Sequence, residues 1–179
     1  MIYFQDENIT VRTMSEADPL HFAKEESAQG WTATQPKLEM RLKHMSEGKC
    51  ISIVAEFNGC PAGYINVYPD CKCGALGGMG YPEIVDFAVL EKFRRKGVGT
   101  KLMDIAEQVA AEYSDIVYLG VGLHSGYGSA QRMYVKRGYI PDGSGVWYGD
   151  KVCQPYSDCK NDDNLNLYFY KKLNRGYKT

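Results

Sequence analysis

The sequence predicts one α/β domain, because strand patterns and helix patterns alternate along its 179 residues. Residues 84–90 are mostly apolar and rich in Val, Ile and Phe, as in a strand covered on both faces. After Gly99 the apolar residues recur at the spacing of an amphipathic helix. Asn58-Gly59 separates two further apolar runs and is a strong hairpin signal. We therefore expect a single domain, residues 1–179, with a sizeable core.

Composition excludes several classes of protein. A hydrophobic content of 44% and a charged content of 24% are ordinary for a globular protein. With 21 Lys+Arg against 22 Asp+Glu, the net charge is −1, so the chain lacks the general excess of positive charge that is typical of nucleic-acid-binding proteins. The first ten residues lack the apolar core of a leader peptide, and no apolar run reaches the roughly 18 residues of a membrane span. We expect a cytoplasmic protein with neither nucleic-acid nor membrane partners.

The first third of the chain predicts a strand, two helices and a hairpin. Residues 8–14 alternate apolar and polar side chains, which is typical of a strand. Asp18-Pro19 predicts an N-cap followed by proline at the first position of a helix that ends near residue 28. Residues 36–48 predict a second helix. The two strands of the hairpin are residues 50–57 and 62–68, and Cys60-Pro61 could shift their register.

The last third predicts the remaining elements. Residues 116–123 form an apolar strand, residues 126–137 a short helix, and a strand begins near residue 140. Residues 141–164 are long, polar and irregular, and residues 165–173 close the sheet as a final strand. The acids of the long segment would suit a cationic substrate or would simply be solvated.

The six cysteines match no zinc spacing, and the three histidines are scattered, so we expect no metal. Reduced, mostly buried thiols are the expectation. Cys71-Lys72-Cys73, which lies in a glycine-rich loop at residues 69–82, could instead bind a metal or form a redox pair. That loop could border a binding site or be only a connection.

The segment Arg94-Arg95-Lys96-Gly97-Val98-Gly99-Thr100 lies where a strand turns into a helix. Free backbone N–H groups and the helix dipole favour an anion there, and glycine lets a phosphate approach the backbone. Three successive cations oppose the dipole, so they need a compensating partner. The spacing fits neither a P-loop nor a Rossmann fingerprint, since a lysine stands at position 92 and a leucine at 102.

This segment resembles the Arg/Gln-x-x-Gly-x-Gly/Ala signature of the GNAT N-acetyltransferase superfamily. Residues 83–89 look like the family's fourth strand. A second segment is similar to Ala-x-x-Leu-Tyr-x-x-x-Gly-Phe, with Ala130, Met133, Tyr134, Gly138 and Tyr139 in register. The resemblance covers about residues 8–172. It implies a GNAT-like α/β fold: a mixed, mostly antiparallel sheet of about seven strands flanked by about four helices.

The family often has an asparagine seven residues before the tyrosine, where it helps to hold the cofactor. This chain has Tyr127 at that position, which puts that one cofactor contact in doubt.

The resemblance further implies acetyl transfer from acetyl-CoA to a primary amine. Backbone amides near the basic loop would hold the pyrophosphate, and the pantetheine arm would lie beside the preceding strand. The N–H of Val89 would polarise the thioester carbonyl. The implied cofactor-binding residues are Phe87, Ala88, Val89, Arg94, Arg95, Lys96, Gly97, Val98, Gly99 and Thr100.

Two residues are candidates for acid-base catalysis. Glu83 matches the position of a strand-borne catalytic glutamate of some GNAT enzymes and would deprotonate the amine, provided that partial burial raises its pKa. Asp86, which faces the other way in a regular strand, and His124 are its rivals. Tyr134 matches the family tyrosine that protonates the leaving thiolate.

The acceptor is not readable from the sequence. Its site would be built from residues 28–36, 69–82 and 141–164, and the long loops favour a small-molecule amine. Trp31 is either a core or lid aromatic or a substrate-stacking residue. A catalytically silent acyl-CoA-binding sensor and a protein or peptide N-acetyltransferase are the alternatives, and a homodimer is possible.

Overall fold

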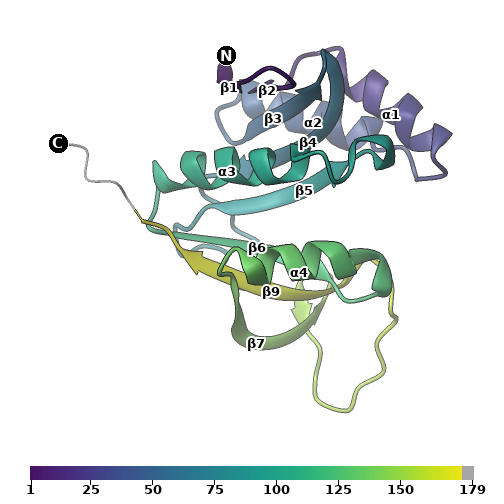
Figure 1. Cartoon of the computed structure of the whole chain (residues 1–179). Helices are drawn as coiled ribbons and strands as arrows, with labels where there is room; N and C mark the ends of the chain where they lie inside the picture. Colours follow the sequence, from purple (N-terminus) through teal and green to yellow (C-terminus); the bar gives the residue numbers. More distant parts are fainter. Residues whose placement is uncertain (175–179) are drawn as a thin grey trace. The chain divides into compact units, whose positions relative to one another are not determined.

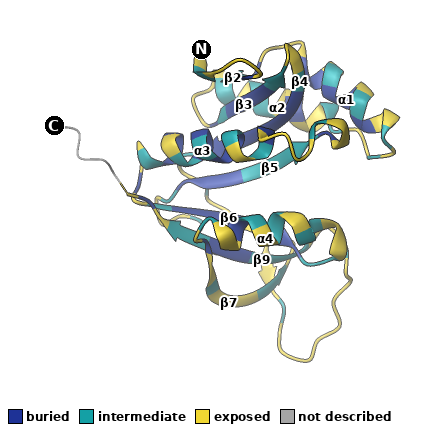
Figure 2. Cartoon of the chain, viewed as in Figure 1, coloured by how far each residue is buried: buried dark blue, intermediate teal, exposed yellow. Residues whose placement is uncertain are grey.

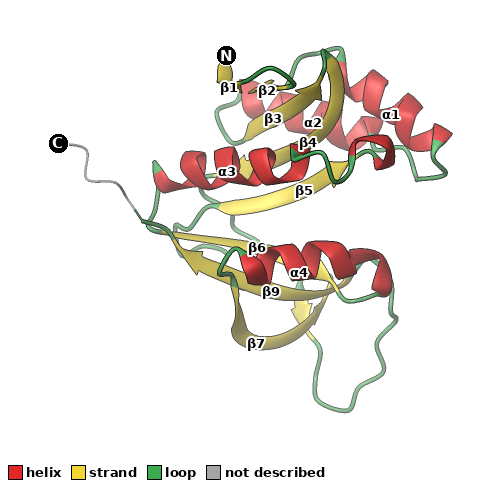
Figure 3. Ribbon diagram, in the orientation of Figure 1, coloured by secondary structure: helices red, strands yellow, loops and turns green. Residues whose placement is uncertain are grey.

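The computed structural model describes residues 1–174, which form two compact units. Unit 1 comprises residues 1–68 and 84–109, and unit 2 comprises residues 69–83 and those from 110 onward. Within the described range there are nine strands and four α-helices (Figures 1 and 3).

Unit 1 contains strands in the spatial order β1-β2-β3-β4-β5 and three helices. The strands are β1 (Ile2–Gln5), β2 (Ile9–Thr13), β3 (Ile51–Phe57), β4 (Cys60–Tyr68) and β5 (Glu83–Val89), whose first residue belongs to unit 2. The helices are α1 (Asp18–Ala28), α2 (Gln35–Ser46) and α3 (Val98–Ala111). The first four strands pair antiparallel.

The hairpin predicted at Asn58-Gly59 is confirmed. Both residues have positive φ, 49° and 76°, as a two-residue turn of the primed type requires. The pairing of β3 with β4 is regular except between Ala55 and Glu56, which face Gly63 and Pro61. The predicted shift of register near Pro61 is therefore also confirmed.

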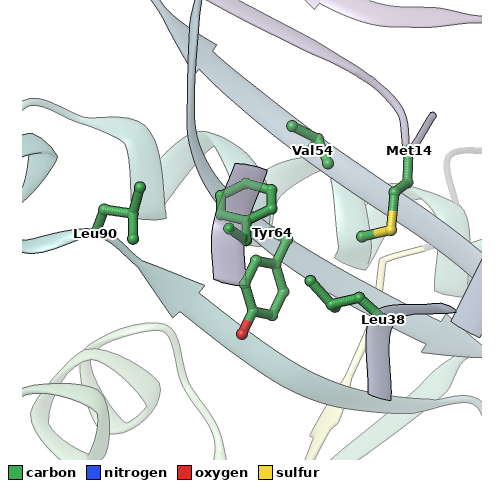
Figure 4. Packing of buried hydrophobic residues seen from close by; sticks show 6 residues of the cluster. Met14, Leu38, Val54, Tyr64 and Leu90 are labelled. Carbon is green, nitrogen blue, oxygen red and sulfur yellow. The ribbon is translucent and has the colours of Figure 1, made fainter. Parts of the chain in front are cut away.

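The core of unit 1 joins its helices to its strands (Figure 4). Its fully buried side chains come from α1, α2, β3, β4 and the flanking loops: Met14, Phe22, Leu38, Val54, Tyr64 and Leu90. Figure 2 shows the buried residues of the helices on the sides that face the strands. The Tyr64 hydroxyl is buried as well and donates to Glu26 Oε1 at 2.8 Å. The other Glu26 oxygen accepts from the Thr34 N–H and hydroxyl, so this buried carboxylate is well satisfied.

Unit 2 contains strands in the order β6-β9-β7-β8 with helix α4 (Gly128–Lys136). The strands are β6 (Ile116–Gly122), β7 (Ile140–Tyr148), β8 (Lys151–Val152) and β9 (Leu165–Lys172), all paired antiparallel. Side chains alternate along β6, so Leu119 and Val121 share one face with their partners Phe169 and Leu167. Helix α4 covers that face (Figure 1).

Two strands were not expected. β1 pairs with β2 through residues that carry no clear period, and β8 forms a short hairpin with the end of β7 inside the segment expected to be irregular. Strand β7, expected to begin near residue 140, also extends into that segment. Glycines at 143 and 145, with φ of 85° and 89°, lie where its register shifts, so its side chains do not alternate regularly.

The predicted capping role of Asp18 is wrong. The N-cap position is Ala17, and Asp18 is the first residue of α1. Its carboxylate accepts instead from the Arg12 guanidinium at 2.7 and 2.9 Å and from the Ser15 N–H and hydroxyl at 2.6 and 2.8 Å. Burial alone would raise the pKa of Asp18, but these hydrogen bonds hold it below its ordinary value. The carboxylate thus ties β2 to the start of α1.

We expect Asp18→Asn to lower the free energy of unfolding by about 1–3 kcal/mol at neutral pH, because it removes one of the two anions of the partly buried Arg12 and leaves only Glu56, 2.7 Å from its Nε. A carboxyl with a lowered folded-state pKa stabilises the fold above its unfolded pKa of about 4, and this contribution is lost as pH falls through the lower, folded value. The difference between wild type and variant should therefore shrink in acid.

Urea unfolding from pH 7 down to pH 3, read by circular dichroism, measures this difference. Asp70→Asn is the matched control, since Asp70 pairs with Lys72 on the surface and should contribute little. Equal stability of wild type and Asp18→Asn at pH 7 would contradict the assigned role.

Candidate functional site

The basic loop, residues 94–100, joins a short 3-10 turn (Glu91–Phe93) to helix α3. Most of it is exposed, and only Val98 is buried. Two of its residues have left-handed backbone, Arg95 with φ 60° and Gly97 with φ 85°. Glycine adopts this conformation freely, whereas arginine does so at a cost, and such strained residues cluster where ligands are clamped.

The backbone amides of this loop are open. The first helical hydrogen bond of α3 runs from Lys101 N to Gly97 O at 3.0 Å. Among the described residues, the N–H groups of positions 95–100 donate to no backbone or side-chain acceptor. Open amides at the positive end of a fourteen-residue helix form an anion site, so the loop fits a pyrophosphate.

The three cations of the loop differ in their surroundings. The Arg94 guanidinium lies 5.2 Å from the centre of the Trp31 ring, and Lys96 Nζ lies 5.0 Å from the centre of the Phe57 ring. Both charges are thus held against aromatic faces. Arg95 is exposed and makes no ion pair with any described residue. Arg95 is therefore the cation most available to a phosphate.

Close packing explains why glycine stands at positions 99 and 63. A Cβ atom at Gly99 would lie 3.2 Å from Phe87 Cζ and 3.5 Å from Val89 Cγ2, so the start of α3 sits directly on β5. A Cβ atom at Gly63 would lie 2.6 Å from the Ala88 carbonyl oxygen, so β4 and β5 approach closely there. The structure therefore brings the predicted strand residues 87–89 together with the predicted glycine loop.

Asp86 interrupts β5. Its φ of 52° bends the strand, so the alternation expected of a regular strand does not hold at this point. Its carboxylate accepts from Arg41 Nε at 2.7 Å and lies 3.2 Å from Lys37 Nζ. Asp86 is therefore engaged in ion pairs that join β5 to α2.

Glu83, at the start of β5, is buried with 8% of its surface exposed. The Tyr118 hydroxyl lies 3.5 Å from Glu83 Oε2 and donates the shorter bond, 3.0 Å, to the Cys73 carbonyl. Burial first and a hydrogen bond to Glu83 second raise the pKa of the Cys71 thiol to about 11. Burial first and the charge of Glu83 second raise the pKa of Tyr118 above its ordinary value. Glu83 is thus a buried carboxylate beside the Tyr118 hydroxyl and the Cys71 thiol.

Tyr134 lies in the middle of α4 and is buried, with its ring 5.8 Å from that of Tyr139. Burial, with a smaller effect of Tyr127, raises the pKa of Tyr134 above its ordinary value, so the phenol stays protonated at neutral pH. Tyr118, the neighbour of Glu83, faces away from α4, because it alternates with Leu119 along β6.

His124 is held through both ring nitrogens. Nδ1 accepts from the Gly126 N–H at 3.1 Å, so Nε2 carries the proton and donates to Asp163 at 2.9 Å. This arrangement leaves His124 no open nitrogen to act as a base.

Tyr127 stands where the family often has asparagine, and its hydroxyl donates to the same Asp163 oxygen. A Cβ atom at Gly122 would lie 2.4 Å from the Tyr127 ring, so this glycine makes room for the larger side chain. Burial first and Asp163 second raise the pKa of Tyr127 to about 12.

The predicted burial of the cysteines is wrong. All six are free, but only Cys50 is buried; Cys71 and Cys153 are half-buried, and Cys60, Cys73 and Cys159 are exposed. Loop and strand-end positions place them at the surface. Among residues 1–174 no three His, Cys, Asp or Glu side chains are grouped as metal ligands. No helix in that range is both long and apolar enough to cross a membrane.

Sequence reasoning missed Tyr118 and Tyr168, whose rings lie 6.3 Å apart. The Tyr168 ring fills the space above Gly120 and beside Gly74 of the glycine-rich loop. The available signal was the pair of glycines at 120 and 122 in an apolar strand, since glycine in a strand marks a close approach. A cavity of about 420 Å³ lies between α4 and the β6–β9 pair, but none of the predicted site residues lines it.

Comparisons with known proteins agree with this architecture. The acetyltransferase (GNAT) family model matches residues 17–139, which includes parts of both units. No curated protein matches the sequence significantly.

Three solved structures illustrate the likeness. Ard1 from Thermoplasma volcanium is 21% identical, with a TM-score of 0.67 over 93% of this chain and 98% of its own. YncA from Salmonella typhimurium, solved with its cofactor acetyl-CoA, is 18% identical, with a TM-score of 0.64 over 96% and 97%. Ribosomal-protein-alanine N-acetyltransferase from Brucella melitensis is 18% identical, with a TM-score of 0.64 over 91% and 99%. At these identities the likeness shows the fold, and the predicted fold class is confirmed.

Proposed function

Because the chain belongs to the acetyltransferase (GNAT) family, we propose that it transfers the acetyl group of acetyl-CoA to a primary amine, most simply that of a small molecule. The observation that carries this proposal is the row of open amides at residues 95–100, which fits the pyrophosphate of such a donor. The family match spans segments of both units, which supports a single catalytic domain over residues 1–179.

In this proposal acetyl-CoA supplies the acetyl group as a thioester. The amides of the basic loop bind the pyrophosphate, and Arg95 adds the most available positive charge. Residues 87–89 orient the pantetheine arm, with the Val89 N–H as the donor to the thioester carbonyl. The packing of Gly99 on Phe87 and Val89 supports this use, because it keeps the anion site against the strand.

Glu83 is the proposed base and Tyr134 the proposed acid. An alkylammonium has a pKa of about 10, so a base must take its proton at neutral pH. Glu83 is buried at the position of the strand-borne glutamate of some family members, and this burial supports its role. Tyr134 remains a neutral phenol, as a donor to a departing thiolate must. Its raised pKa makes it a weak acid, so its contribution should be modest.

The other candidate functions are a protein N-acetyltransferase and a catalytically silent acyl-CoA sensor. A protein N-terminus is the other candidate acceptor, since one structural neighbour is a ribosomal-protein-alanine N-acetyltransferase. A catalytically silent acyl-CoA sensor would need the loop but neither Glu83 nor Tyr134. The burial of both side chains favours an enzyme.

Arg95→Ala should raise KM for acetyl-CoA by roughly 10- to 100-fold with little change in kcat, because it removes one charge-assisted phosphate contact. The KM of the variant should also depend less on ionic strength than that of wild type. Initial rates at two salt concentrations measure both effects. Lys43→Ala, which removes an exposed cation of α2, is the control. An unchanged KM in Arg95→Ala would remove this residue from the site.

Tyr134→Phe should lower kcat by roughly 10²-fold or less, with donor binding retained. The assay follows loss of the thioester by ultraviolet absorbance across polyamines, aminoglycosides, amino acids and short peptides with free N-termini. Tyr113→Phe, at an exposed tyrosine outside the segments expected to build the acceptor site, is the matched control and should be silent. Turnover with one class of amine names the acceptor. Saturable acetyl-CoA binding without turnover of any amine would favour the sensor.

Glu83→Gln should lower kcat and remove the acidic limb of the pH profile. A base works only when deprotonated, so the activity of wild type should fall as pH drops through the pKa of that base. The profile of kcat/KM for the amine, recorded for Glu83→Gln and for Asp86→Asn, separates the two carboxyls. An acidic limb that survives in Glu83→Gln would assign the base elsewhere.

A further inference from the structure

The segment that joins β8 to β9 brings two thiols together. Cys153 follows β8 directly, and Cys159 lies six residues further along the chain. Their Sγ atoms are 2.8 Å apart. Both thiols are free, Cys159 is exposed and Cys153 is half-buried. The pair is therefore accessible to a small reagent from the solvent.

Backbone hydrogen bonds hold the loop in this shape. Cys153 N donates to Val146 O at 2.7 Å, which fixes the first cysteine against β7. Ser157 donates to Gln154 O from its N–H at 3.1 Å and from its hydroxyl at 2.7 Å, so the chain turns back on itself. Tyr156, at the tip, has φ 66° and is fully exposed. The approach of the two sulfurs is thus a consequence of the turn between them.

We propose that Cys153 and Cys159 form a reversible disulfide site that exchanges with low-molecular-weight disulfides such as oxidised glutathione. This inference is independent of acetyl transfer, since it uses no residue of the proposed catalytic site.

The exchange takes place in two balanced steps. One Cys thiolate attacks the small disulfide, which breaks its S–S bond, forms a mixed disulfide and releases one thiolate. The second Cys thiolate attacks the protein sulfur of that mixed disulfide and releases the second small thiolate. The two protons lost by the cysteines end on the two released thiols. The protein is oxidised by two electrons and the small disulfide is reduced by two.

The neighbouring thiol raises the pKa of Cys153 above its ordinary value, so we expect the first attack to come from Cys159, which is also the more exposed sulfur. The other cysteines provide contrasts. Cys60 and Cys73 are exposed, so they test whether exposure alone produces a bridge. Burial and Glu83 raise the pKa of Cys71 to about 11, which keeps that thiol largely protonated.

The test uses the full chain, incubated with reduced and oxidised glutathione at a series of ratios, quenched by acid and alkylated. Intact mass should show the loss of two hydrogen atoms and the protection of two thiols from alkylation. Chymotryptic cleavage after Tyr156 should give two peptides that stay joined until reduction, because the bridged cysteines flank the cut. The readout is a mass, so it does not depend on catalytic activity.

Cys153→Ser and Cys159→Ser should each abolish the bridge and leave a glutathione adduct on the remaining thiol. Cys60→Ser and Cys73→Ser should bridge as wild type does, and circular dichroism checks that all four variants fold. Three results would overturn the proposal: complete alkylation of both thiols at every glutathione ratio, separate adducts on both without a bridge, or a bridge to a different cysteine.

Discussion

The start of helix α3 leaves backbone N–H groups that donate to no described residue. Strand β5 and the basic loop pack around this open helix end. A helix cannot pair its own first N–H groups, so they need a cap, water or a ligand. None of the described side chains accepts a hydrogen bond from these N–H groups. Gly97 turns the backbone into the helix with φ 85°, and Gly99 lets the helix rest on Phe87 and Val89. The amides are therefore held in place and directed at whatever anion binds.

The cations beside this helix end are arranged to suit the same anion. Positive charge at the positive end of a helix is unfavourable unless a negative partner is present. Arg94 and Lys96 offset part of that cost by lying against the Trp31 and Phe57 rings. Arg95 has no such support and takes a strained backbone conformation in solvent. A phosphate bound there would offset the repulsion between these cations and the helix end.

In the proposed chemistry, the candidate bases are distinguished by their neighbours and not by their chemical type. Asp86 is a carboxylate like Glu83, yet its two oxygens are engaged by Arg41 and Lys37. His124 has the most suitable ordinary pKa, yet both of its nitrogens are bonded. Glu83 is buried, with the Tyr118 hydroxyl 3.5 Å from its Oε2 and the Cys71 thiol beside it. Tyr118, whose hydroxyl lies near Glu83, is on strand β6.

By itself, the sequence determined the hairpin at Asn58-Gly59, the strand-loop-helix at residues 83–111 and the family, because each depends on local period, turn chemistry or a contiguous motif. Tertiary structure alone decided which charges are engaged. Asp18 pairs with Arg12 instead of capping its helix, Asp86 is held by α2, and the thiols of Cys153 and Cys159 meet across a turn. These outcomes depend on which side chains meet in the folded chain, and the spacing of residues in the sequence does not predict such contacts. The same reason explains why β1 and β8 were missed: short strands are defined by the partner they pair with.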